Sequence, residues 1–183
     1  MAVLNSVGNA LTGVTGTGNF VGANTPTFVT GTVTVPSVTF SSTSGIIGTT
    51  TNDNAAALSV GQEITSVIPL ASAVSLTTAT PANLTTLSLT AGDWDVYGNI
   101  TATLSAGTDF TQFMVWISLF NASVPDHSLM NKTTTLGASI LGLSAPYFRV
   151  SASGTTTVYL SCNQVFAGGT MTACGGFYAR RRR

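Results

Sequence analysis

The feature that most constrains the fold is the alternation of apolar and polar residues from Asn83 to Leu104, NLTTLSLTAGDWDVYGNITATL. Because side chains alternate across a β-strand, such a pattern gives one apolar and one polar face. In the second half of this stretch, the even-numbered positions carry the apolar residues Trp94, Val96, Ile100, Ala102 and Leu104. Ala91-Gly92-Asp93 has the residue types of a turn. The stretch predicts two strands joined as a hairpin, whose apolar face a second sheet must cover.

Similar runs follow at regular spacing along the chain and predict further strands. They are Glu63–Leu70, Val74–Thr78, Asp109–Phe120, Leu136–Leu143, Ala145–Ala152, Thr155–Phe166 and Thr170–Ala179. Ser153-Gly154 predicts a hairpin turn, Asn121–Thr135 an exposed polar loop, and Ala55–Gly61 one weak helical turn. About eight strands without a convincing helix predict an all-β, antiparallel β-sandwich that is jelly-roll-like.

Three phrases in the chain carry a resemblance to a known class of proteins. "LTAGDWDVYGNI" resembles a strand pair in the C-terminal domains of many tailed-bacteriophage fibre and virion-surface proteins. "GGFYARRRR" is similar to their usual aromatic ending, and "TGTGNFVGANTPTFVTGTV" resembles a phrase of phage tail fibres. The resemblance implies a virion protein that assembles in the bacterial cytoplasm, commonly as a homotrimer, and it contains no catalytic signature.

Composition divides the chain into an extended N-terminal segment, residues 1–50, and a knob domain, residues 51–183. The segment is rich in Gly, Thr and Val, and it has no pattern that would form its own core. Its large apolar residues are spaced along it: Phe20, Phe28, Val33, Val35 and Phe40. Each of these side chains loses about 1.5–3 kcal/mol of favourable burial free energy if it stays exposed to water. We therefore expect them to pack in a trimer or against another virion protein, as an anchor; the alternative is a flexible linker.

Charge is scarce and unevenly placed. Only 7% of the residues are charged, against about 25% in typical soluble proteins, which suggests that other chains cover much of the surface; the alternative is that Thr and Ser hydroxyls keep it soluble. Without the last four residues, two basic side chains stand against six acidic ones, a net charge of −4. We expect the tail, Arg180, Arg181, Arg182 and Arg183, to dock on an acidic surface or to remain solvated. A nucleic-acid binder would spread its basic residues over a face, so no nucleic-acid partner is expected.

The run Asp109–Phe120 is apolar on both faces, although an antiparallel sheet offers a core to only one of them. A neighbouring subunit is the simplest cover for the second face, and a long loop is the alternative. The predicted trimer interface consists of Met114, Trp116 and Phe120.

The sequence offers little for catalysis or metal binding. It has one histidine, His127, beside Asp126 and without a recognisable nucleophile. Asp93 and Asp95 share a strand face, but two carboxylates supply only part of a Ca²⁺ shell. Cys162 and Cys174 lack zinc-site spacing; a buried free thiol at Cys162 is favoured over a disulfide. No enzyme activity, metal, cofactor, signal peptide or membrane insertion is expected.

Binding residues are expected in the polar loop and among the tyrosines outside the apolar faces. The predicted host or glycan contacts are Asn121, Asp126, His127, Asn131 and Lys132. Tyr97, Tyr147 and Tyr159 would stack on sugars, fill an interface or shield the sheet. The function predicted is that of a trimeric tail fibre or host-attachment protein. The alternative is a capsid decoration protein, a head fibre or cement that stabilises the phage head.

Overall fold

The computed structural model describes residues 51–125, 129–134 and 139–182. By its internal contacts the chain divides into two compact units, Met1–Thr49 and Thr50–Arg183. The proposed anchor residues Phe20, Phe28, Val33, Val35 and Phe40 lie outside the described residues, as do Asp126, His127 and Arg183.

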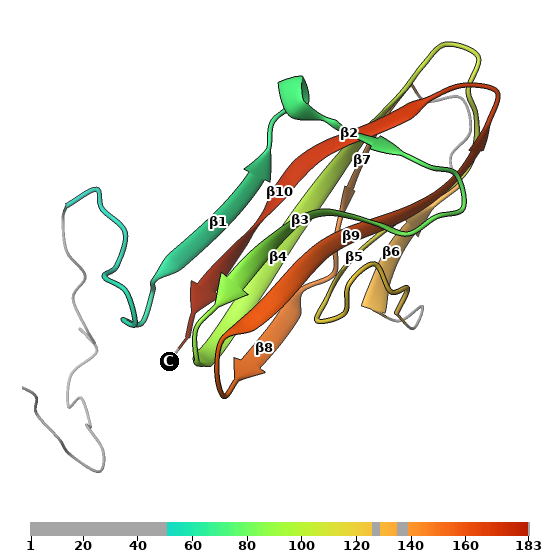
Figure 1. The fold of residues 1–183 in the computed structure, drawn as a ribbon. Coiled ribbons are helices and arrows are strands. Elements are labelled where there is room, and N and C mark those ends of the chain that lie inside the picture. The colour runs from blue at the N-terminus through green and yellow to red at the C-terminus, as the bar shows by residue number, and fades with distance from the viewer. Residues whose placement is uncertain (1–50, 126–128, 135–138, 183) are drawn as a thin grey trace, which may run out of the picture. The chain divides into compact units, whose positions relative to one another are not determined.

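The described chain forms two antiparallel sheets that face each other as layers (Figure 1). The six-stranded sheet contains β1 (Glu63–Ile68), β2 (Val74–Leu76), β4 (Gly92–Leu104), β7 (Ile140–Ser144), β8 (Phe148–Ala152) and β10 (Met171–Arg181). The four-stranded sheet contains β3 (Ala82–Leu89), β5 (Asp109–Ser118), β6 (Met130–Thr133) and β9 (Thr156–Ala167). A short 3₁₀ turn, η1 (Leu70–Ser72), joins β1 to β2. The predicted all-β sandwich is confirmed.

The strand order is that of a jelly roll. β1 and β2 both pair with β10, and β7 and β8 both pair with β4, so each couple acts as one interrupted strand. Lettered B to I in chain order, the strands then run B-I-D-G in one sheet and C-H-E-F in the other. This is the eight-stranded arrangement of two Greek keys.

The predicted hairpins are wrong, although their turns are in place. β3 pairs with β9 and β4 pairs with β10, so the turn between β3 and β4 carries the chain from one sheet to the other. The turns from β8 to β9 and from β9 to β10 also cross between the sheets. Alternation marks where a strand lies and which face is apolar, but it does not identify the partner strand.

Three segments differ from their predicted structure. Residues 55–61 form turns and no helix. β6 lies within the stretch predicted to be an exposed loop, where it pairs with β5 through four residues from Trp116↔Met130 to Phe113↔Thr133. β10 continues through Arg180 and Arg181, so two of the four terminal arginines belong to a strand and not to a solvated tail.

The core lies between the sheets and is built from the predicted apolar parities. Its largest fully buried members include Trp94, Phe113, Phe177, Ile100 and Leu160. Gly98 is required where β4 passes closest to these side chains, because a Cβ there would lie 2.8 Å from Phe177 Cβ and 2.9 Å from Leu160 Cδ1.

A second apolar cluster, Met114, Trp116 and Met130, lies on the other face of β5. Trp116 is 0% exposed and Met114 is 5% exposed in the single chain. The segment after β5 is tied back to the four-stranded sheet: Asn83 Oδ1 accepts from the Ala122 N–H, and Asn83 Nδ2 donates to Asn121 Oδ1. Of the three predicted interface residues, only Phe120 has an exposed side chain in the single chain, at 72%.

Candidate binding face

Pairing across the six-stranded sheet lines up side chains in rows on its outer face. One row is charged, with Glu63, Arg180, Asp95 and Arg149 in register. In the next row, Tyr178 is opposite Tyr97. We use the name tyrosine–arginine face for Asp95, Tyr97, Tyr147, Tyr178, Arg180 and Arg182.

Charge is concentrated on and beside this face. The chain has six basic and six acidic residues, and half of these twelve lie here: Glu63, Asp93, Asp95, Arg149, Arg180 and Arg182. In a chain so poor in charge, their gathering at one end of one sheet marks this surface as chemically distinct.

Both aspartates of β4 are neutralised by arginines. Arg149 Nε and Nη2 donate to the two carboxylate oxygens of Asp93, at 2.9 and 2.6 Å. This bidentate pairing, together with the charge of Asp93, raises the pKa of Arg149. Arg182 Nε lies 3.5 Å from Asp95 Oδ2. Neither aspartate is therefore an unused carboxylate available for acid–base chemistry.

The tyrosines are held in place and half exposed. Tyr147 donates from its hydroxyl to Asp95 Oδ1 at 2.5 Å, and this hydrogen bond raises the pKa of the phenol. The rings of Tyr97 and Tyr147 lie 5.5 Å apart with a tilt of 47°. Tyr97, Tyr147 and Tyr178 are each 50% exposed. Together they form a surface of aromatic rings that is open to solvent, and Asp95 anchors one of its members, Tyr147, by a hydrogen bond.

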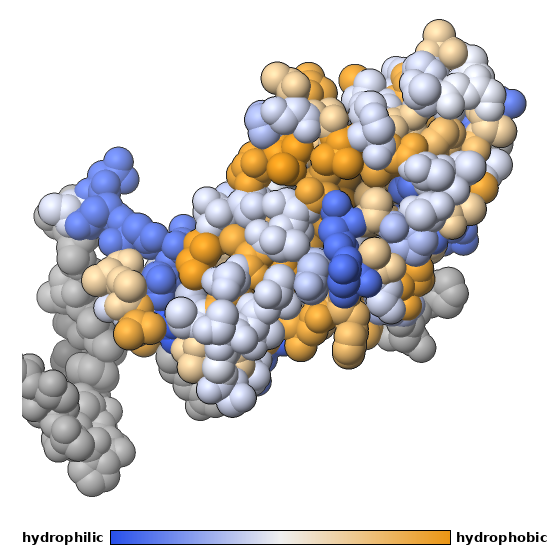
Figure 2. All heavy atoms as spheres, in the orientation of Figure 1, coloured by the Kyte–Doolittle hydropathy of each residue, from blue (hydrophilic) through white to orange (hydrophobic). Residues whose placement is uncertain are grey.

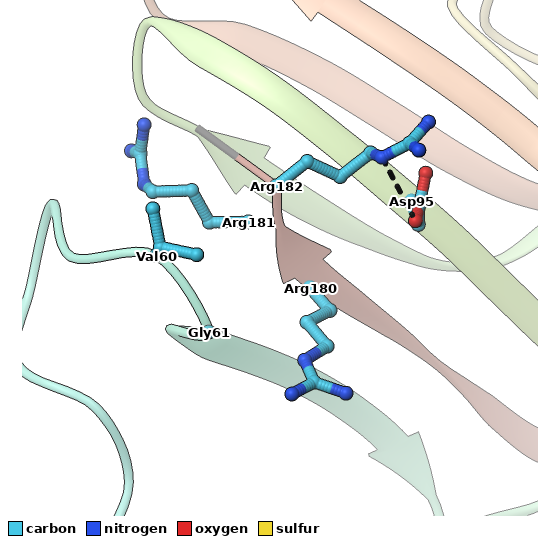
Figure 3. A pocket seen from close by; sticks show the side chains of 6 residues that line it. All are labelled: Val60, Gly61, Asp95, Arg180, Arg181 and Arg182. Carbon is cyan, nitrogen blue, oxygen red and sulfur yellow. Dashed lines mark ion pairs between the residues drawn. The ribbon is translucent and has the colours of Figure 1, made fainter. Parts of the chain in front are cut away.

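A hollow lies on each side of the tyrosine row. One, of about 290 Å³, is lined by Tyr97, Gly98, Asn99, Ser144, Ala145 and Tyr178. The other, of about 270 Å³, is lined by Val60, Gly61, Asp95, Arg180, Arg181 and Arg182 (Figure 3). Because Asp95 and Tyr97 alternate on β4, and Tyr178 and Arg180 on β10, the two hollows adjoin across the rings.

Arg181 belongs to the opposite side of β10 and has a structural role. It is 4% exposed, and its guanidinium carbon lies 4.4 Å from the centroid of the Trp94 ring. The guanidinium donates to Gln62 Oε1 at 3.2 Å, Ala91 O at 2.8 Å and Thr90 Oγ1 at 2.5 Å. Only Arg180 and Arg182, on either side of it, point to the outer face.

The predicted loop contacts do not gather at one place among the described residues. Asn121 is bonded to Asn83, and Asn131 Nδ2 donates to Ser144 O at 2.6 Å. Lys132 is exposed on β6. The Asn131 bond brings β6 of one sheet against β7 of the other, beside the hollow that Ser144 lines.

The sequence reasoning missed Asn99, Ser144, Tyr178 and the outward direction of Arg180. The alternation through GFYARRR, residues 176–182, places Tyr178, Arg180 and Arg182 on one face, and this pattern is visible in the sequence. Their meeting with Tyr97 and Asp95 depends on the pairing of β4 with β10, which no local pattern encodes. Tyr159, predicted with the other tyrosines, lies on β9 of the other sheet.

Other chemistry is sparse in the part of the chain that the structure describes. No group of three His, Cys, Asp or Glu residues there could hold a metal ion. Both cysteines are free; Cys162 is buried, on a strand of the four-stranded sheet, and Cys174 lies on β10 of the six-stranded sheet. No helix among these residues is long and apolar enough to cross a membrane.

Comparisons with known proteins gave structural matches alone. No protein-family model matches the sequence, and no curated protein matches it. Among solved structures, a chain in the structure of the infectious bursal disease virus Gx strain is 9% identical, with a TM-score of 0.42, and the match covers 66% of this chain and 32% of that one. A chain in the crystal structure of the T13 particle of the same virus is 11% identical, with a TM-score of 0.39, over 66% of this chain and 31% of that one. The chain thus spans about a third of the length of the chains it matches.

Proposed function

We propose that the protein is a non-enzymatic structural component of a tailed-bacteriophage virion, and that it serves there as a trimeric, fibre-type host-attachment protein. Residues 1–50 would join it to other virion proteins, and the sandwich would face outward. The protein would assemble in the host cytoplasm and reside in the virion.

The observation that carries this proposal is the meeting of two phrases that resemble phage proteins. The phrase around Trp94 lies on β4, and the phrase that ends in the arginines lies on β10. These strands pair without interruption from Met171↔Leu104 to Arg181↔Trp94. Chance matches to short phrases would have no reason to lie on neighbouring strands. Phrases that form one unit, closed by the Arg181–Trp94 contact, support a common origin with those proteins.

A second role, capsid decoration, is favoured by the surface around the charged face. Apolar side chains reach the surface beside η1 and β1, where Leu70 and Val67 are more than half exposed (Figure 2). Apolar side chains in such number suit a protein whose surface is largely covered by neighbours in an assembly. A cement protein would use them against the capsid.

Adsorption separates the two roles. Purified full-length protein, fluorescently labelled, should bind host cells and compete with adsorption of the phage that carries it. Deleting residues 1–50 should leave a folded knob that still binds cells but no longer joins particles. A protein that does not bind cells, and whose loss makes the particles heat-sensitive without changing adsorption, would instead be a decoration protein.

A further inference from the structure

We propose that the tyrosine–arginine face is a binding site for an acidic oligosaccharide. Tyr97 and Tyr178 would stack on sugar rings, and Arg180 would pair with a sugar carboxylate. This inference rests on the proposed host-attachment function and places its ligand contacts on a sheet face, away from the loop favoured by the sequence.

The platform is rigid before any ligand arrives. The two rings assigned to stacking, Tyr97 and Tyr178, stand on β4 and β10, the two longest-paired strands of the sheet, whereas Tyr147 lies between β7 and β8. A chain of contacts holds the Tyr97 ring: Arg182 pairs with Asp95, Asp95 accepts from Tyr147, and Tyr147 packs on Tyr97. A surface ordered in advance loses little conformational entropy on binding, so weak stacking contacts give a useful net affinity.

The rings offer the chemistry that a sugar needs. A phenol ring presents an apolar face to the C–H groups of a sugar and a hydroxyl to its polar groups. The neighbouring hollow adds the Asn99 amide and the Ser144 hydroxyl, while Gly98 and Ala145 leave room for the ligand. From Asp95 to Asn99 the strand advances about 13 Å, so both hollows together fit an oligosaccharide better than a single sugar.

Charge determines which saccharides fit. Arg180 and Arg182 present their guanidinium groups at the other hollow, beside the Asp95 carboxylate, which is already paired with Arg182. Glu63 is opposite Arg180 in the strand register, but no ion pair joins them. Arg180 is exposed, points away from Asp95 and makes no ion pair with any described residue (Figure 3). An arginine fork recognises a carboxylate through two parallel hydrogen bonds. The hollow therefore favours a uronic or sialic acid residue over a neutral sugar.

The test uses an array of bacterial surface polysaccharides that contain uronic or sialic acids, each printed beside its carboxyl-reduced form. The full-length protein should bind acidic members and lose binding to their reduced forms. Tyr178→Ala and Arg180→Ala should each weaken binding by about tenfold or more, since the loss of one stacking or charge-assisted contact is worth about 1.4 kcal/mol or more. Arg180→Lys should retain part of the binding.

Tyr159→Ala, the same change on the other sheet, is the matched control and should bind normally. Unfolding midpoints of the Tyr178 and Arg180 variants should match that of the parent protein, because both side chains are exposed. Equal binding to acidic and reduced forms, no binding to any member, or full binding by Tyr178→Ala and Arg180→Ala would overturn the proposal. So would loss of particle incorporation, without loss of saccharide binding, in these variants, which would make the face a protein interface.

Cell binding keeps the two proposals apart. If the parent protein binds host cells and both variants bind equally well, the saccharide site is wrong and host attachment stands. If the parent protein does not bind host cells, host attachment fails whatever the array shows.

Discussion

Single side chains decide how the end of the sandwich is closed. Arg181 shares its strand parity with Phe177 and Ala179, so it enters the interior with them. There the Trp94 ring and the oxygens of Thr90, Ala91 and Gln62 surround its guanidinium. The four consecutive arginines predict a uniform basic tail, whereas strand alternation buries Arg181 and exposes Arg180 and Arg182.

Replacing Arg181 should cost stability, whereas replacing its neighbour should not. Arg181→Met keeps a long side chain but removes the cation–π contact and leaves buried acceptors unpaired. We therefore expect the free energy of unfolding to fall by about 2–3 kcal/mol. The midpoint of urea unfolding measures it. Arg180→Met, at an exposed position, should change the free energy of unfolding by no more than about 0.5 kcal/mol. Equal effects of the two changes would contradict the assigned role.

Cys162 should make stability depend on alkaline pH. Burial raises the pKa of its thiol from 9.0 to about 12. Above pH 9 the unfolded chain releases this proton and the folded chain does not. The free energy of unfolding therefore falls by about 1.4 kcal/mol per pH unit. Between pH 8 and pH 10 the free energy of unfolding should fall by about 1.4 kcal/mol less in Cys162→Ala than in the parent protein. The same fall in both proteins would refute the prediction.

At the scale of strands, the sequence predicts where each strand lies but not which strand it pairs with. Trp94 and Ile100 lie on a correctly predicted apolar parity, because alternation is local. The pairing of β4 with β10 and of β3 with β9 joins residues that are far apart in the chain, so no local pattern reports it. The binding face depends on this pairing. For that reason the sequence predicts Tyr97 as an exposed tyrosine but does not predict that Tyr178 lies beside it.

The pairing of β10 with β4 also depends on one glycine. Gly175 has φ +135°, and a Cβ there would overlap the Asn99 carbonyl oxygen of β4. Gly175→Ala should therefore lower the free energy of unfolding by about 2–4 kcal/mol, which thermal unfolding would show. Gly154→Ala is the control, because nothing lies within 4 Å of a Cβ at that position. A parent-like melting temperature for Gly175→Ala would count against the strand geometry.

At the scale of the whole molecule, we expect three copies of the chain to associate. Trp116 and Met114 are covered within one chain, so Trp116→Asp would unfold the knob whether or not a trimer exists. Phe120 tests the trimer better because its ring is exposed. Light scattering should give about three times 18.6 kDa for the parent protein and a smaller mass for Phe120→Asp, with unchanged unfolding.

Leu70→Asp is the matched control for the trimer. Leu70 is as exposed as Phe120 but lies on η1, away from the segment that follows β5. It should leave the mass unchanged. A monomeric parent protein, or loss of the trimer in Leu70→Asp alone, would show that Phe120 is not at the interface.

The order of the strands also has a consequence for synthesis on the ribosome. β1 pairs with β10, from Glu63↔Arg180 to Ile68↔Gly175, and β4 pairs with β10 on its other edge. Until β10 has been translated, the nascent chain holds β1 and β4 with open edges and with the Trp94 face uncovered. Such edges are templates for pairing with other chains. We therefore expect the sheet to close only after β10 has emerged from the ribosome, and to close slowly, as is usual where contacts join distant parts of a chain. Polysomes that make several copies side by side would be prone to mispairing between them.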